Sequence, residues 1–379
     1  MGRKKHSGGA AAKGIPGRLR AEKERREVDA KLKQLRIAVA RVRALAELSE
    51  PDVTEATAAV FYDIRRLALA PRGFVTESVR CELWLFLAGR AGFEPLPSHA
   101  PMHFVARCGA PHRDDAQVEK DIDRSLWHYD VVKGIRESER RSKRRALTHV
   151  INATLSTNEQ LHYYQGYHDV CSVFLLALGE QRAFEVAQRV SATYHREAMG
   201  AGFETVMQAT RLVFPLLKVE DSELHAHIRA SGVEPYFALP WVITWFAHQL
   251  PRFQDVARLY DAFLVSHPLF CVYVSATLVL EARARVLKCE CDFGTMHSLL
   301  SKLPQVMEIE KVIARATVLL HSTPPSELLR LGDFDTATLE KSTFFQCPYE
   351  YQTHFGVEKP FLQTPAVSKK TKKDASTMR

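Results

Sequence analysis

Apolar residues recur along most of the chain at the three- and four-residue spacing of amphipathic helices. One such helix is predicted over residues 76–89, where Thr76 can cap the first turn and Gly89 can end the last one. No segment of six or more residues alternates strictly between apolar and polar positions, so we expect few strands. Further helices are predicted over 116–129, 183–199, 207–217, 222–231, 240–249, 253–264, 295–302 and 308–321. The pattern therefore predicts an all-α protein.

Two segments are more apolar than this amphipathic pattern. Residues 167–178 are apolar almost all round, which indicates a helix in the centre of a large fold. Residues 262–280 contain no Asp, Glu, Lys or Arg, and this length would be enough to cross a bilayer. A Ser-His-Pro sequence ending at Pro268 interrupts them, and Pro favours the first turn of a helix. We therefore expect two buried helices, the second over 268–287, and no membrane span.

The two ends of the chain differ in composition from its middle. Residues 1–17 are rich in Gly, Ala and Lys, and we expect them to be disordered. Residues 18–50 predict a charged amphipathic helix that either docks on the body or binds a partner or a membrane surface. A globular domain is predicted over 55–330, with a linker at 91–114. Residues 331–379 predict an irregular segment that ends in a Lys-rich tail.

The formal net charge of +8 resides in these ends. Residues 1–50 contain 14 Lys or Arg and 6 Asp or Glu, and residues 366–379 contain five and one. The remaining residues, 51–365, contain 33 and 37, a net charge of −4. A mildly acidic body is not suited to wrapping nucleic acid, so we expect no nucleic-acid partner. The basic ends either keep the chain soluble or favour an anionic membrane surface.

The cysteines indicate a reducing compartment. There are seven, an odd number without regular spacing, and no apolar leader segment precedes them. The close pair Cys289 and Cys291 lacks the Cys-x-x-Cys spacing of zinc sites, so we expect ordinary thiols and no metal. These features predict a cytoplasmic protein.

Candidate chemistry begins with Arg124 in the helix predicted over 116–129. Four apolar residues share one face of that helix, namely Val118, Ile122, Leu126 and Tyr129. Arg124 lies on the opposite face, and Asp121, one turn earlier, can fix the direction of its guanidinium. An arginine held in this way can contact a phosphate on a partner. Taken alone, the two residues are typical of a surface ion pair.

A second candidate is the sequence His-Tyr-Tyr-Gln-Gly-Tyr-His-Asp at 162–169. Gly166 permits a sharp turn at the N-terminus of the helix predicted over 167–178, where anions are favoured. Gln165 has donors and an acceptor and can orient a water molecule. His168 and Asp169 would suit a metal-dependent phosphohydrolase, but no further ligands stand in register with them.

A third group contains Trp241, Trp245 and Phe246, followed by Arg258 and Asp261. Arg258 and Asp261 are three residues apart, and their neighbours are apolar. We expect them to form a structural ion pair inside the fold.

The order of these motifs resembles the TBC domain, the catalytic domain of Rab GTPase-activating proteins. Val118-x-x-Asp121-x-x-Arg124 is followed by Tyr163-x-Gln165-Gly166, as in that family. Three further motifs are similar to those of the family and stand in the same order: one containing Arg80 and Trp84, one containing Trp241, and one containing Arg258 and Asp261. The sequences at 162–169 and 324–328 are similar to one subclass, which a C-terminal helix anchors in the endoplasmic reticulum.

The resemblance implies a multi-helix bundle in two helical lobes that stimulates GTP hydrolysis by a Rab of the early secretory pathway. Arg124 would act as an arginine finger and Gln165 as a glutamine finger. Asp121 would orient Arg124, while Tyr163 and Gly166 would support the Gln165 loop. Arg80, Trp84, Trp241, Arg258 and Asp261 would be structural. The partner would be a Rab in its GTP form, and GTP and Mg²⁺ would come with it, so the chain would need no cofactor of its own.

The sequence departs from the resembled subclass after Pro324, where no run of about twenty apolar residues follows. We therefore expect no transmembrane anchor, and a cytoplasmic location or a peripheral one on endoplasmic reticulum or Golgi membranes. Two other functions stay open at this point. One is a catalytically silent Rab-binding scaffold, and the other is a membrane-trafficking adaptor.

Overall fold

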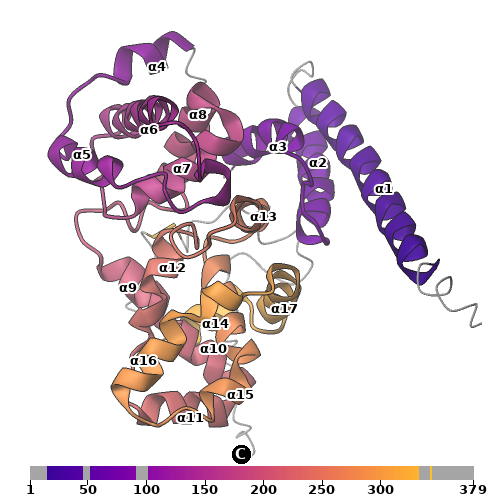
Figure 1. Ribbon diagram of the computed structural model, residues 1–379, viewed down its shortest axis with the longest axis vertical. Helices are drawn as coiled ribbons and strands as arrows, with labels where there is room; N and C mark the ends of the chain where they lie inside the picture. Colours follow the sequence, from indigo (N-terminus) through magenta and orange to yellow (C-terminus); the bar gives the residue numbers. More distant parts are fainter. Residues whose placement is uncertain (1–14, 46–51, 91–100, 333–341, 344–379) are drawn as a thin grey trace, which may run out of the picture.

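The computed structural model describes residues 15–45, 52–90, 101–332 and 342–343. Within these ranges every regular element is an α-helix or a short 3-10 helix, and no strand is present (Figure 1). The all-α prediction is therefore confirmed. Most of the predicted disordered segment 1–17 and of the irregular segment 331–379 lies outside the described residues.

The N-terminal helix packs on the body. α1 (Ile15–Leu45) contacts α2 (Asp52–Leu69) and α3 (Glu77–Arg90), and it runs alongside α2 in Figure 1. Leu35 and Ala38 of α1 are buried in the main hydrophobic core. Arg43 of α1 and Glu82 of α3 form an exposed ion pair of 3.0 Å. The described part of the predicted helix, up to Leu45, thus docks on the body.

The remaining helices form two groups, with one helix between them (Figure 1). The first group is α4 (Pro101–Arg107), α5 (Asp115–Asp123), η1 (Asp130–Val132), α6 (Glu137–Thr157), α7 (Tyr167–Leu178) and α8 (Glu180–Ala192). The second group is α9 (Glu204–Arg211), α10 (Val213–Glu220), α11 (Ser222–Ala230), η2 (Pro235–Ala238), α12 (Leu239–Ile243), α14 (Phe270–Glu281), α15 (Arg283–Val286), α16 (Phe293–Ser301), η3 (Leu303–Val306), α17 (Ile309–Ser322) and α18 (Pro325–Leu331). The helix between them is α13 (Phe253–Phe263), which contacts α2, α7 and α17.

The two strongly apolar segments lie in the centre of the fold. α7 has the predicted bounds 167–178, and ten of its twelve residues are buried. Residues 262–280 include the end of α13 and most of α14, with the predicted break around Pro268 between them. Among the described residues, no helix combines the length and apolarity needed to cross a membrane.

The carboxylate of Asp261 joins the N-terminal helices to α13. Its side chain has no exposed surface and accepts hydrogen bonds from Arg80 Nη2 (3.0 Å) and Trp84 Nε1 (2.9 Å), both on α3. The backbone N–H of Phe74 is a further donor, at 3.0 Å. The ion pair predicted between Arg258 and Asp261 is not formed, because Arg258 instead donates to Glu310 of α17 at 3.0 Å. Spacing along one helix could not reveal partners from other helices.

Two predicted helices end early, and a residue with positive φ follows each within three positions. The helix expected over 116–129 stops at Asp123, and Leu126 has φ +59°. The helix expected over 240–249 stops at Ile243, and Trp245 has φ +48°. In both places the turn lets large apolar side chains enter the core. The centroid of the Trp245 ring lies 5.2 Å from that of the Tyr260 ring. Burial of such a ring stabilises by about 2 kcal/mol or more, which offsets a strained backbone of about 1–2 kcal/mol.

Other boundaries differ from the sequence predictions. α3 continues through Gly89 to Arg90, and the predicted linker 91–114 contains α4. The helices predicted over 207–217 and 268–287 are each divided in two, at Leu212 and Ala282. The helix predicted over 183–199 ends at Ala192, and neither α2 nor α6 was predicted.

We predict that Asp261→Asn lowers the free energy of unfolding by about 3–5 kcal/mol, because it leaves the Arg80 guanidinium buried without its counter-charge. Urea unfolding followed by circular dichroism measures the change. Glu327→Gln is the control, since Glu327 pairs with Arg330 at the surface and its loss should cost less than about 1 kcal/mol. Equal effects of the two substitutions would contradict the role given to Asp261.

Candidate functional site

Arg124 follows the last residue of α5, and its side chain is held by a buried acid. Its Nη2 donates to Asp121 Oδ1 at 2.5 Å. The Arg124 side chain is 67% exposed, whereas that of Asp121 has no exposed surface. The expectation of a surface ion pair was therefore wrong for Asp121, which is buried. A guanidinium with one end fixed in this way keeps its other N–H groups directed to solvent.

Tyr163 connects the second candidate motif to the first. Its hydroxyl donates to Asp121 Oδ2 at 2.9 Å, and its backbone N–H donates to Asp114 Oδ2 at 2.9 Å. Asp114 precedes α5, so the loop before α7 is attached close to both ends of that short helix. Burial, followed by the nearby Asp121 charge, raises the pKa of Tyr163, which keeps the hydroxyl protonated as a donor.

Gly166 shapes the turn that presents Gln165. Gly166 has φ +110°, and a Cβ atom there would lie 2.9 Å from Thr244 Cγ2. α7 begins at the next residue, as expected. Gln165 is exposed, and within the described part of the chain its amide has no hydrogen-bond partner. Arg124 and Gln165, far apart in sequence, are thus both exposed and both linked to Asp121, one directly and one through the Tyr163 loop.

The polar network extends further than the sequence analysis predicted. Tyr163 gives its proton to Asp121, so His168 Nδ1, 2.9 Å from the same hydroxyl, is the donor in that contact. His168 Nε2 lies 3.5 Å from Asp169 Oδ1, and His248 Nδ1 donates to Asp169 Oδ2 at 2.8 Å. The pair His168 and Asp169 is therefore part of a group of polar contacts that extends from Arg124 to His248. In the described ranges, no three His, Cys, Asp or Glu side chains gather as metal ligands.

Opposing effects set the ionisation of Asp169 and His248. Burial acts to raise the pKa of Asp169, but the hydrogen bond from His248 and the charges of neighbouring histidines bring it below the ordinary value. The hydrogen bond to Asp169 in turn raises the pKa of His248. His248 lies after α12, and only its contact with Asp169 reveals it, since no sequence motif contains it.

The residues predicted to be structural lie in the scaffold. Arg80 and Trp84 bind Asp261, Arg258 binds Glu310, and Trp241 stacks on Phe246 with ring centroids 5.8 Å apart. Their contribution to the site is indirect, through the placement of α13 against α7.

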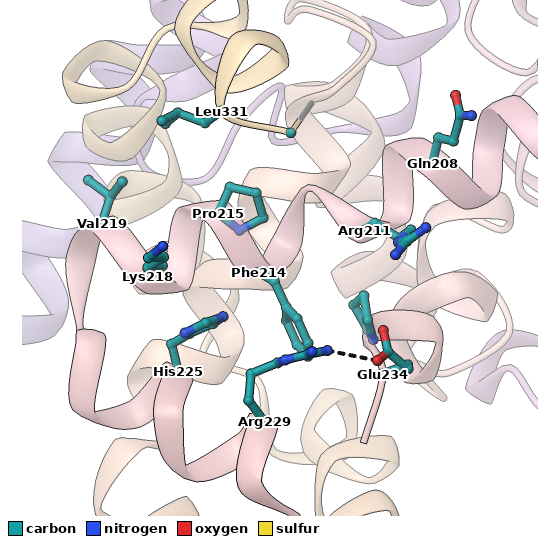
Figure 2. A pocket seen from close by; sticks show the side chains of 12 residues that line it. Gln208, Arg211, Phe214, Pro215, Lys218, Val219, His225, Arg229, Glu234 and Leu331 are labelled. Carbon is teal, nitrogen blue, oxygen red and sulfur yellow. Dashed lines mark hydrogen bonds and ion pairs between the residues drawn. The ribbon is translucent and has the colours of Figure 1, made fainter. Parts of the chain in front are cut away.

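A hollow of about 730 Å³ opens in the second group of helices, between α9, α10, α11 and the end of α18. Figure 2 shows Lys218, His225 and Arg229 around it, with Arg229 bound to Glu234 at 2.7 Å. The elements that line it are not those that carry Arg124 and Gln165. The hollow is therefore a feature separate from the candidate site.

The chain is similar in sequence to a known family and to several known proteins. A family model described as the Rab-GTPase-TBC domain matches residues 77–287, which include the whole candidate site. TBC1 domain family member 20 from Mus musculus is 36% identical over 268 residues, covering 70% of this chain and 65% of that protein. The GTPase-activating protein gyp10 from Schizosaccharomyces pombe is 29% identical over 261 residues, covering 68% and 67%. The chain thus matches slightly less than two thirds of the mouse relative's length.

Solved structures have the same fold. The Ypt/Rab-GAP domain of Gyp1p superposes with a TM-score of 0.54 at 18% identity, covering 68% of this chain and 92% of that one. The Chlamydomonas flagellar RabGAP TBC domain superposes with a TM-score of 0.52 at 16% identity, covering 76% and 94%. Identities this low establish the all-α fold and nothing further.

We predict that Gly166→Ala destabilises the chain more than Gly134→Ala does. Both glycines have positive φ, but only at Gly166 does an added Cβ meet another atom, that of Thr244. Gly134→Ala should cost about 1–2 kcal/mol from backbone strain alone, and Gly166→Ala should exceed it. Urea unfolding of the two variants tests the difference. Equal costs would mean that the Thr244 contact relaxes freely.

We predict that the stabilisation due to His248 is lost at alkaline pH. A histidine whose pKa is raised by folding stabilises fully below its unfolded value of about 6.5, and the effect disappears as pH rises through the folded value. The wild type should therefore exceed His248→Gln in unfolding free energy by up to about 1 kcal/mol near pH 6, because the side chain is largely exposed. Unfolding in urea between about pH 5.5 and 8.5 measures the difference. A difference that stays constant over that range would contradict an ionic pair.

Proposed function

The chain belongs to the Rab-GTPase-TBC family, and from that premise we propose that it is a GTPase-activating protein for a Rab-family GTPase. In this proposal the chain supplies Arg124 and Gln165 to the nucleotide site of its partner. The observation that supports it most directly is the buried Asp121 carboxylate, which binds Arg124 with one oxygen and Tyr163 of the Gln165 loop with the other. One acid thereby sets the position of two exposed polar side chains.

Arg124 would stabilise charge in the transition state. Phosphoryl transfer depends mainly on positioning and on charge stabilisation, and an arginine supplied in trans accelerates it by about 10³–10⁵. That range corresponds to about 4–7 kcal/mol of barrier. Since Asp121 already holds the guanidinium, little side-chain freedom remains to be lost when the GTPase binds.

Gln165 would orient the attacking water. Its amide offers donors and an acceptor, and it has no partner within the described residues that would have to be displaced. Tyr163 and Gly166 are positioning residues for this loop, through the hydroxyl bond to Asp121 and the turn at φ +110°. GTP and Mg²⁺ belong to the GTPase in this mechanism. This chain therefore accelerates the reaction but would bind no nucleotide in the absence of the GTPase.

The substrate in this proposal is the GTP form of a Rab that acts between the endoplasmic reticulum and the Golgi. Support comes from the motif at 162–169 and from the 36% identity to TBC1 domain family member 20. The chain would act from the cytoplasm or on the surface of those membranes. Its basic ends would add attraction to anionic lipid, and α1 contains ten of their nineteen Lys and Arg residues.

We predict that Arg124→Lys and Gln165→Ala each remove at least about a hundredfold of the acceleration. Lysine keeps a positive charge beside Asp121, so the fold is spared, but it lacks the planar fork that binds two phosphate oxygens together. Single-turnover GTP hydrolysis by a panel of purified Rabs, with and without each variant, measures the loss and identifies the substrate.

Arg330→Lys is the matched control for Arg124→Lys. Arg330 is 70% exposed and binds Glu327, three residues earlier, at 2.5 Å, as Arg124 binds Asp121. It lies on α18 and should leave the acceleration unchanged. Binding to a Rab without any acceleration by the wild type would instead identify a silent scaffold and overturn the proposal.

A further inference from the structure

The loop that follows Arg124 carries the one exposed tryptophan of the chain. All four tryptophans are described, and Trp84, Trp241 and Trp245 are at most 2% exposed. Trp127 is 51% exposed, and Val131, in η1 directly after the loop, is 47% exposed. Large aromatic side chains are seldom left half in water, and those at protein surfaces are enriched at interfaces.

Two arginines of α6 hold this loop in place. Arg140 lies with its Cζ 3.6 Å from the centre of the Trp127 ring, and it donates to the carbonyls of Leu126 and Val132 on either side. Arg144 lies one turn later, with its Cζ 5.2 Å from the same ring, and donates to the carbonyl of Ser125 at 3.3 Å. Trp127 is therefore fixed before any partner arrives, which lowers the entropy lost on binding.

The backbone between Arg124 and Trp127 is strained. Leu126 has φ +59° and is 1% exposed, so the turn directs Leu126 into the core while Trp127 stays outside. A non-glycine residue in this conformation costs about 1–2 kcal/mol, and such strain is concentrated at functional sites. Packing of Leu126 explains the inward side chain, but it gives no reason for the indole on the outside.

We propose that Trp127 is an anchor for the GTPase, inserted into an apolar patch bordered by carboxylates on the partner's surface. The inference rests on the proposed function. Arg124 must reach the phosphates of the bound nucleotide, so the GTPase must cover the surface around it. Trp127 lies three residues further along the same loop and is rigid and exposed, which are the properties of residues that dominate binding energy.

The charge of α6 indicates which side chains surround the apolar patch on the partner's surface. Residues 137–145 contain five basic and two acidic side chains, and Arg141 and Arg145 are exposed. A partner surface with carboxylates around an apolar centre complements this helix. An anionic membrane offers the same charges, but a membrane against Trp127 would exclude a GTPase from Arg124. The GTPase is therefore the occupant that fits both residues.

The first test is kinetic. Trp127→Ala should raise the KM for the GTP-bound GTPase at least tenfold and leave kcat within about twofold, because the indole contributes to binding and not to the chemistry. Phe293→Ala is the matched control, since Phe293 is 59% exposed on α16 and stacks on His297. It should change neither constant. A kcat loss at unchanged KM would contradict an anchor.

The second test is made on the wild-type chain and uses a variant only to assign a resonance. The full chain is labelled with 5-fluorotryptophan, and Trp127→Phe identifies the ¹⁹F resonance of Trp127 among the four. Addition of unlabelled GTPase in a non-hydrolysable GTP form should shift that resonance and remove its solvent isotope shift, while the three buried tryptophans stay unchanged. Vesicles of phosphatidylserine and phosphatidylcholine serve as the competing arm.

The outcomes separate the two proposals. If the wild type accelerates hydrolysis but the Trp127 resonance does not respond to the GTPase, the anchor is wrong and the proposed function stands. A response to vesicles and none to the GTPase likewise overturns the anchor. If no GTPase is bound or accelerated, both proposals fail together.

Discussion

A carboxylate taken out of water must find donors, and Asp261 finds them in one distant segment of the chain. Arg80, Trp84 and the backbone of Phe74 all donate to it, although they are about 180 residues away in sequence. An unpaired charge at this depth would cost several kcal/mol, so α3 and α13 must come together for either to be stable there. Because α13 also contacts α7, the placement of the helix that begins two residues after Gln165 depends on this contact.

Asp121 is a second buried carboxylate that is bound by donors from other residues, with one difference that matters for the proposed function. Its two donors are Tyr163, which is partly buried, and Arg124, which is mostly exposed. The acid therefore needs a cation that remains accessible to a partner. Asp169 is a third case, in which one oxygen faces His168 and the other binds the exposed His248. Buried acids with half-exposed basic partners thus account for much of the site's polar surface.

The sequence predicted the features that depend on local pattern. The bounds of α7 followed from its apolar residues, and the exposure of Arg124 followed from its position opposite Val118 and Ile122. Partners across the fold could not be predicted in this way. Arg258 stands three residues from Asp261, yet it binds Glu310 because the Asp261 oxygens are occupied by α3. α6 was missed because its first half is charged and shows no apolar face.

That missed helix explains why the loop after α5 has two independent supports. Asp121, within α5, holds Arg124, whereas Arg140 and Arg144 of α6 hold Trp127 and the carbonyls around it. A change at position 127 leaves the bond between Asp121 and Arg124 in place, and a change at Arg124 leaves the stacking of Arg140 on Trp127. The catalytic role proposed for Arg124 and the binding role proposed for Trp127 thus depend on separate contacts within one short loop.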